Sequence, residues 1–279
     1  MKRWILFAGG LVAASGIALG AFVWNAGGWD NFKLRHFHLT QLLSDQTREL
    51  ADIRARNVAP EQASRIDLGE LISGGPPKDG IPSIDSPRFT SAAETPFADD
   101  EAVLGVEVNG DVRAYPYGIL NWHEVVNDTV GGVPVTITYC PLCDTGLVFQ
   151  RGGTTFGVSG KLYQSCLVMY DRADDTLYVQ PWGIGAVGPA VNRILERLPV
   201  VKTTLGAWKA RHPDTRVLST ETGHRRDYFK YPYGSYYTDR NLVFPVRGDE
   251  QLALHPKAII SYAFRPAEAT PHNAFAGCH

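Results

Sequence analysis

The sequence has little sulfur and almost no excess of charge. Only four of its 279 residues are cysteine and two are methionine, and 27 Lys and Arg face 29 Asp and Glu. A chain without a basic field cannot hold a phosphate backbone by releasing counterions, so nucleic acid is excluded as an expected partner. Internal repeats and low-complexity tracts are lacking too, which leaves one large or two small globular domains.

Charge is missing altogether between Trp4 and Trp24. This apolar run is close to the roughly 20 residues that span a bilayer, and Lys2 and Arg3 before it indicate an inside N-terminus. Residues 1–24 are therefore predicted to be the transmembrane anchor of a single-pass protein of the cytoplasmic membrane. A cleaved signal peptide is the alternative, because Ala18-Leu19-Gly20 resembles a cleavage site. Both interpretations place the rest of the chain in the periplasm or at the cell exterior.

The chain is predicted to have four regions, of which the anchor is the first. After the anchor, residues 25–67 are predicted to be a juxtamembrane helix and linker, residues 68–265 the main domain, and residues 266–279 a C-terminal tail. The tail carries His272, Cys278 and His279, which form either a soft metal-ligand set or simply a mobile end.

Short β-type runs separated by turns dominate the main domain. Asn109-Gly110 between two such runs predicts a hairpin with a type I′ turn. Because successive runs lie close in sequence, the fold class is predicted to be α+β, predominantly antiparallel β, with the N-terminal transmembrane helix. The expected strands are 102–108, 111–115, 133–139, 147–150, 154–159, 167–171, 176–180, 242–246 and 258–264, and the expected helices are 119–126, 190–197 and 205–211.

Two of the few cysteines stand three residues apart, in Cys140-Pro141-Leu142-Cys143. A β-rich run leads into them and Gly146 follows, which favours a turn between two strands over the helix start of a thioredoxin-like dithiol. Such a turn lets both thiolates face one metal ion. Three interpretations stay open: a metal site, a redox dithiol, and a structural bridge.

A metal site needs further ligands, and two residues are candidates. His123 is the first, with Glu124 beside it as a candidate base, and Cys166 is the second. For both, a plain packing role is the alternative. The sequence thus nominates Cys140, Cys143, His123 and Cys166 as metal ligands.

Six ordered motifs between about Leu68 and about Tyr262 carry a resemblance to a known family. They are Gly74–Pro82, Ala114–Pro116, His123–Asp128, Thr138–Cys143, Gly157–Tyr163 and Met169–Arg172. The chain resembles the domain-of-unknown-function family 3179, which implies an exported or lipid-linked domain built around the two-cysteine motif and no defined activity. Members generally have Gly where this chain has Asp144, and an acidic residue where it has Cys166.

Asp171 and Arg172, in the last motif, are the remaining catalytic candidates beside Glu124. They form either a buried ion pair or a clamp for a substrate carboxylate. Together the residues predict a membrane-anchored, extracytoplasmic metal-binding protein, with copper as the first choice because soft sulfur suits copper(I), and zinc or iron as alternatives. Whether it is a redox metalloenzyme or a metal carrier stays open, and a thiol-disulfide oxidoreductase of the cell envelope is the competing class.

Overall fold

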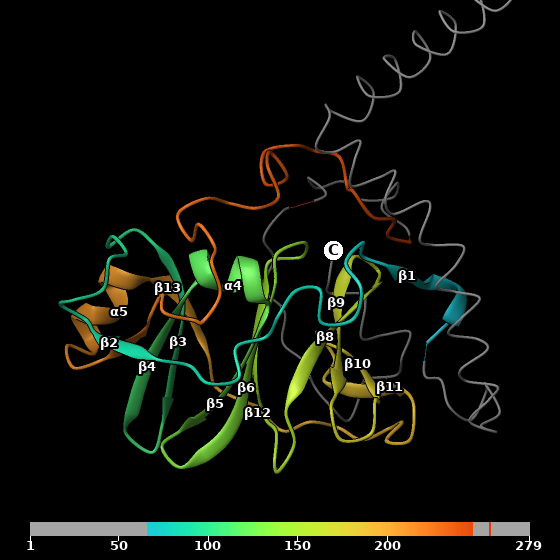
Figure 1. The fold of residues 1–279 in the computed structure, drawn as a ribbon, viewed down its shortest axis with the longest axis horizontal. Coiled ribbons are helices and arrows are strands. Elements are labelled where there is room, and N and C mark those ends of the chain that lie inside the picture. Colours follow the sequence, from blue (N-terminus) through green and yellow to red (C-terminus); the bar gives the residue numbers. More distant parts are fainter. Residues whose placement is uncertain (1–65, 248–256, 258–279) are drawn as a thin grey trace, which may run out of the picture.

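Three antiparallel sheets stand side by side in the computed structural model, which describes residues 66–247 and 257 (Figure 1). The first sheet has the order β13 (Val201–Thr204), β3 (Ala102–Val108), β4 (Asp111–Pro116), β14 (Arg216–Leu218) and β2 (Phe89–Ser91). The second has the order β12 (Arg197–Leu198), β7 (Thr145–Gln150), β6 (Val133–Cys140) and β5 (Val125–Val130). The third has the order β1 (Leu71–Ser73), β8 (Phe156–Tyr163), β9 (Cys166–Asp171), β10 (Leu177–Val179) and β11 (Ile184–Val187).

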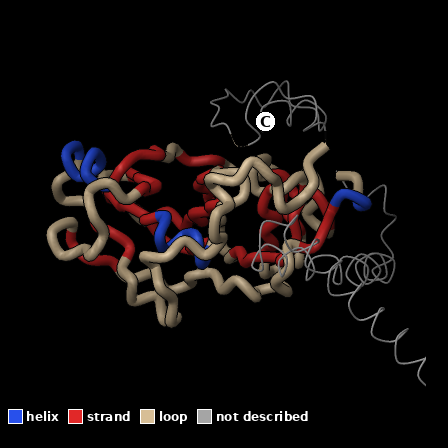
Figure 2. The backbone as a smooth tube through the Cα atoms, turned by 90° about the horizontal axis from the view of Figure 1, so that it is seen from above, coloured by secondary structure: helices blue, strands red, loops and turns tan. Residues whose placement is uncertain are grey.

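Helices are short and few in this part of the chain. They are η1 (Leu68–Glu70), α4 (Tyr117–His123) and α5 (Leu205–Arg211). Figure 2 shows α4 near the middle of the molecule, with strands on both sides of it. The predicted fold class, α+β with mostly antiparallel strands, is therefore confirmed. Among the described residues, β14 and β4 pair in parallel, as do Ile84 and Val126 in an isolated bridge.

The predicted hairpin at Asn109-Gly110 is present between β3 and β4. Both turn residues have positive φ, 49° for Asn109 and 78° for Gly110, as a type I′ turn requires. A Cβ atom at Gly110 would meet nothing within 4 Å, so the glycine is needed for its φ angle rather than for space.

The second and third sheets are joined by a side-chain amide that forms the same pair of hydrogen bonds as a neighbouring strand would. Asn127 on β5 donates from its amide nitrogen to the Phe156 carbonyl at 2.8 Å and accepts from the Phe156 amide at 2.9 Å. A second link runs from Gln180 to the Thr138 hydroxyl at 3.0 Å. Buried polar groups must find such partners, and here they fix how the two sheets meet.

Hydrophobic side chains fill the space on both sides of the second sheet. Toward the first sheet the core contains Leu104, Tyr115, Leu120 and Ile137. Toward the third sheet a separate cluster contains Cys140 together with Phe149, Phe156, Val158, Met169 and Tyr178. The two-cysteine motif therefore lies where the second and third sheets pack together.

Several predicted elements differ from the structure. The helix expected at 119–126 begins and ends earlier, as α4, because the β-branched pair Val125-Val126 continues as strand β5. No helix forms at 190–197, where a turn leads into β12, and no strand forms at 242–246. The helix at 205–211 is confirmed, with the Thr204 hydroxyl accepting from the Ala207 amide as N-cap.

The anchor, the juxtamembrane helix, the C-terminal tail and the strand expected at 258–264 lie outside the described residues. Within the described residues, no helix is long and apolar enough to cross a bilayer.

Candidate functional site

Two hairpin turns bring three cysteines together. Cys140 ends β6 and Cys143 lies in the turn to β7, where Cys140 pairs with Thr145 across the hairpin. Cys166 begins β9 after the turn Gln164-Ser165, whose φ angles of 50° and 59° are again positive. The expected strand-turn-strand geometry of the two-cysteine motif is therefore present, and no helix starts at it.

Asp144 closes the turn of the two-cysteine motif with φ at 50°. Asp tolerates this left-handed region better than most residues, although glycine adopts it at no steric cost. Glycine would therefore suit this position on backbone grounds. The Asp144 carboxylate also holds the turn in place, since it accepts from the Tyr139 hydroxyl at 3.0 Å and pairs with Lys202.

Cys143 is the centre of the sulfur cluster. Its side chain hydrogen-bonds with those of both Cys140 and Cys166, and it is partly exposed whereas the other two thiols are buried. None of the three forms a disulfide with another described residue. The Leu167 amide donates to the Cys140 sulfur at 3.3 Å, which is the kind of contact that stabilises a negative sulfur.

The surroundings keep these thiols protonated. Burial raises the pKa of Cys140 well above its usual value, and the contact with Cys143 and the charge of Glu124 raise it further. For Cys143, the hydrogen bond with Cys140 lowers the pKa, but the one with Cys166 and burial outweigh it and the pKa is raised. Neither thiol is an activated nucleophile of the kind found at a helix start.

Glu124 is the acid-base group beside the sulfurs. It caps α4 with φ at 58°, a strained value for a glutamate, and its carbonyl accepts from the Tyr139 amide at 2.8 Å. Burial raises the pKa of its carboxyl group to about 7, although the hydrogen bond from the Tyr233 hydroxyl, 2.8 Å long, lowers it. A carboxyl with this pKa can exchange protons near neutral pH.

His123 points away from the sulfurs. Its Nδ1 lies 2.7 Å from the Pro82 carbonyl oxygen and its Nε2 lies 2.8 Å from the Tyr228 hydroxyl. Both ring nitrogens therefore have partners, and burial lowers the pKa of the ring to about 4. The turn at Glu124 thus separates neighbours that the sequence placed in one site.

Asp171 and Arg172 lie at the far end of β9 from Cys166. At about 3.3 Å per residue, five residues of strand separate them from the sulfurs by roughly 17 Å. Instead of pairing with each other, Asp171 lies 3.9 Å from Arg193, and Arg172 donates to Asp85 at 2.8 Å and to the Ser83 hydroxyl at 2.7 Å. These contacts tie the proline-rich loop, residues 74–88, to β9, so both residues lie outside the sulfur site.

The segment that covers the site was predicted from its Tyr and Pro content to be a long loop, with no part in the site. Residues 228–238, called the tyrosine segment below, contain five of the twelve tyrosines. Tyr233 donates to Glu124, Tyr236 donates to the Leu142 carbonyl at 3.1 Å, and the hydroxyls of Tyr237 and Tyr139 lie 2.7 Å apart. The local density of tyrosine was the available signal, because each hydroxyl needs a buried partner.

Together these residues define a β-rich domain with a buried cluster of thiols and one titrating carboxyl group. No group of three or more His, Cys, Asp or Glu side chains among the described residues is placed so that it could hold a metal ion. The chain belongs to the family described as Protein of unknown function (DUF3179), whose model matches residues 78–276, so the predicted resemblance is confirmed. Neither a curated protein nor a solved structure matches the chain.

The pKa of Glu124 predicts how stability depends on pH. The folded-state value, about 7, exceeds the ordinary 4.5, so the folded chain binds the extra proton between these two pH values and its stability falls as pH rises through them. At about 1.4 kcal/mol for each pH unit the loss amounts to about 3 kcal/mol. We expect Glu124→Gln to lose this dependence in urea unfolding measured from pH 4 to 8.

Tyr233→Phe provides the matched comparison for Glu124→Gln. Its hydroxyl lowers the pKa of Glu124, so its removal is expected to extend the fall in stability to higher pH. Parallel stability curves for the wild type and Glu124→Gln across this range would show that Glu124 does not titrate in this way.

Proposed function

We propose that the chain is a membrane-anchored, extracytoplasmic protein that binds a soft transition metal ion through Cys140, Cys143 and Cys166. Copper(I) is the first choice, with zinc and iron as alternatives, because thiolates select these metals. The observation that carries the proposal is the contact of Cys143 with both other thiols, which come from two separate hairpins.

The chemistry of the donors supports a cation at this place. Three thiols that crowd one another in a buried site resist ionisation, and a bound soft cation would compensate the charge of all three at once. The Leu167 amide is already directed at one sulfur. Because the cysteines form two contacting pairs rather than a closed cage, the proposal requires their side chains to close around the ion.

His123 is not included in this proposed set, because both its ring nitrogens have other partners. Glu124 takes a supporting role. Binding a metal to cysteine releases protons, and Glu124, with its pKa of about 7 and its charge acting on Cys140, is a group able to accept one. This role suits a redox metalloenzyme and a metal carrier equally.

A thiol-disulfide oxidoreductase is the second candidate. It is favoured by the partial exposure of Cys143, which would let an outside disulfide reach a thiol that has two neighbouring thiols. The raised pKa values of Cys140 and Cys143 count against it, since exchange needs a thiolate.

Metal titration of the full-length protein, reduced and free of oxygen, tests the proposal. We expect about one equivalent of copper(I) to bind in competition with a chromogenic chelator, with release of protons into a weakly buffered solution. Less than about a tenth of an equivalent of copper, zinc or iron would contradict it. A reversible dithiol potential between about −120 and −270 mV without metal binding would favour the oxidoreductase instead.

A further inference from the structure

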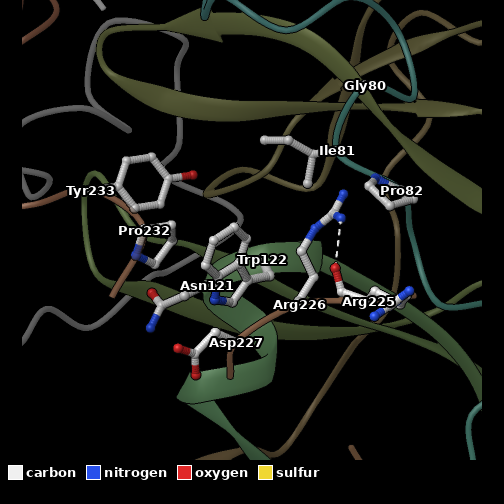
Figure 3. A pocket seen from close by; sticks show the side chains of 10 residues that line it. All are labelled: Gly80, Ile81, Pro82, Asn121, Trp122, Arg225, Arg226, Asp227, Pro232 and Tyr233. Carbon is white, nitrogen blue, oxygen red and sulfur yellow. Dashed lines mark hydrogen bonds between the residues drawn. The ribbon is translucent and has the colours of Figure 1, made fainter. Parts of the chain in front are cut away.

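Tyr233, whose hydroxyl donates to Glu124, is one of the residues that line a cavity of about 460 Å³ (Figure 3). Its volume lies in the range of small-molecule sites. Apolar walls come from Ile81, Pro82, Trp122 and Pro232. The flat indole of Trp122 stands in the middle of these side chains (Figure 3), so the cavity offers a surface for a planar or apolar body.

Two arginines line the cavity without a carboxylate partner among the described residues. Arg226 donates to the Arg225 carbonyl at 3.1 Å, and its guanidinium carbon lies 5.8 Å from the Trp122 ring centroid. Arg225 forms no ion pair with a described residue either, and the one acidic residue of the lining, Asp227, accepts from the Phe229 amide at 3.2 Å. An arginine is always protonated, so the cavity carries net positive charge.

The pKa of a neighbouring histidine is consistent with this positive charge. The pKa of the neighbouring His123 is lowered first by burial and in addition by the charges of His224 and Arg226. The cavity therefore disfavours a cationic ligand and favours an anionic one.

Asn121 adds an amide without a protein partner. Its side chain is only 9% exposed, it lines the cavity, and its Oδ1 atom is buried with no hydrogen-bond partner in the described part of the chain. Buried polar groups normally have partners, and an unpaired acceptor next to a cavity indicates that a donor group of a ligand supplies the missing bond.

From these contacts we infer that the cavity binds a small organic carboxylate with a planar or apolar body. The carboxylate is held by the guanidinium of Arg226, whose planar fork matches it. The body of the ligand lies against Trp122. This inference goes beyond the proposed metal binding and does not depend on it.

The position of the cavity gives the ligand a route to the sulfur site. Tyr233 lines the cavity and donates to Glu124, and the charge of Glu124 acts on Cys140. A ligand that shifts Tyr233 therefore changes the acid-base group next to the thiols.

Benzoate is the probe for this inference, and benzamide is its uncharged counterpart of nearly the same shape. Titrations of the full-length protein are followed by tryptophan fluorescence, with Trp122→Phe identifying the signal. We expect saturable benzoate binding, with benzamide weaker by about tenfold or more, since a charge-assisted hydrogen bond contributes about 1.5–3 kcal/mol. Arg226→Ala is expected to weaken benzoate to the level of benzamide.

Arg211→Ala is the matched control, because Arg211 is an exposed arginine on α5, away from the cavity lining. Benzoate binding that survives in Arg211→Ala and is lost in Arg226→Ala supports the inference. Three outcomes would overturn the inference. They are an equal affinity for benzoate and benzamide, the absence of saturable benzoate binding, and an equal loss of binding in Arg226→Ala and Arg211→Ala. The third outcome would mean an adventitious anion only.

The same titration in Cys143→Ser separates this inference from the proposed metal site. Benzoate binding that persists in a variant unable to hold metal supports a carboxylate cavity that stands alone. Absence of benzoate binding to a wild-type protein that does bind copper(I) overturns the cavity inference and leaves the metal proposal in place.

Discussion

Replacing Cys143 by serine is expected to lower the affinity for copper(I) by at least about 100-fold. Residues that merely support a metal ligand cost about 10- to 100-fold when they are removed, so loss of a direct ligand reaches or exceeds the upper figure. Cys143 is chosen because it contacts both other thiols. Serine keeps the size of the side chain while it removes the soft donor. The measurement is competition with a chromogenic copper(I) chelator under reducing conditions.

Two further variants sharpen this test. Cys278→Ser removes the remaining cysteine, in the C-terminal tail outside the described residues, and is expected to leave the affinity unchanged. Cys166→Asp replaces a soft donor with a carboxylate and is expected to weaken copper(I) more than zinc, because zinc accepts carboxylate ligands. An unchanged affinity in Cys143→Ser would contradict the three-sulfur site, and a loss in Cys278→Ser would move the site to the tail.

The local turns could be predicted from the sequence because their chemistry is local. Asn109-Gly110 specifies its hairpin through two positive φ angles. Gly146 after the two-cysteine motif correctly indicated a strand in place of a helix. The end of α4 was predicted too late, because the helical pattern of residues 119–126 runs directly into β-branched residues. The hydrogen bonds that end the helix come from another strand: the Tyr139 amide donates to the Glu124 carbonyl, and β5 pairs with β6.

Only part of the candidate site was predictable. The partnership of Cys166 with the two-cysteine motif was proposed from residue type, and the structure brings the three thiols together. His123 and Glu124 differ in direction although they are neighbours, because Glu124 adopts φ at 58° at the end of α4. No periodicity in the sequence reveals that angle. The contacts of the tyrosine segment, and the cavity lined by Arg225 and Arg226, depend on packing between residues about 100 positions apart in the chain. The bond between Tyr233 and Glu124 is an example. Such contacts become visible only in the folded chain.

A strong expected effect on stability lies in the first half of the domain, at Asp128. This residue belongs to the same motif as His123, but its carboxylate accepts from Arg113 at 2.6 Å, from the Tyr115 hydroxyl at 2.6 Å and from the Thr129 amide at 2.7 Å. The side chains of Arg113 and Asp128 are only 9% and 7% exposed. Asp128 is therefore a partner of a buried cation rather than a base for the sulfur site.

Asp128→Ala is expected to lower the free energy of unfolding by about 3–5 kcal/mol, because it leaves the buried guanidinium of Arg113 with Asp111 as its one remaining carboxylate. Glu221→Ala is the control. Its pair with Arg88 is 72–75% exposed, and the expected loss is about 0–1 kcal/mol. The double variant Arg113→Met/Asp128→Ala is expected to recover part of the stability, since the uncompensated charge is gone. The free energy of unfolding is measured in urea for the wild type and these three variants. Equal losses in Asp128→Ala and Glu221→Ala would show that burial adds nothing to the ion pair of Arg113 and Asp128.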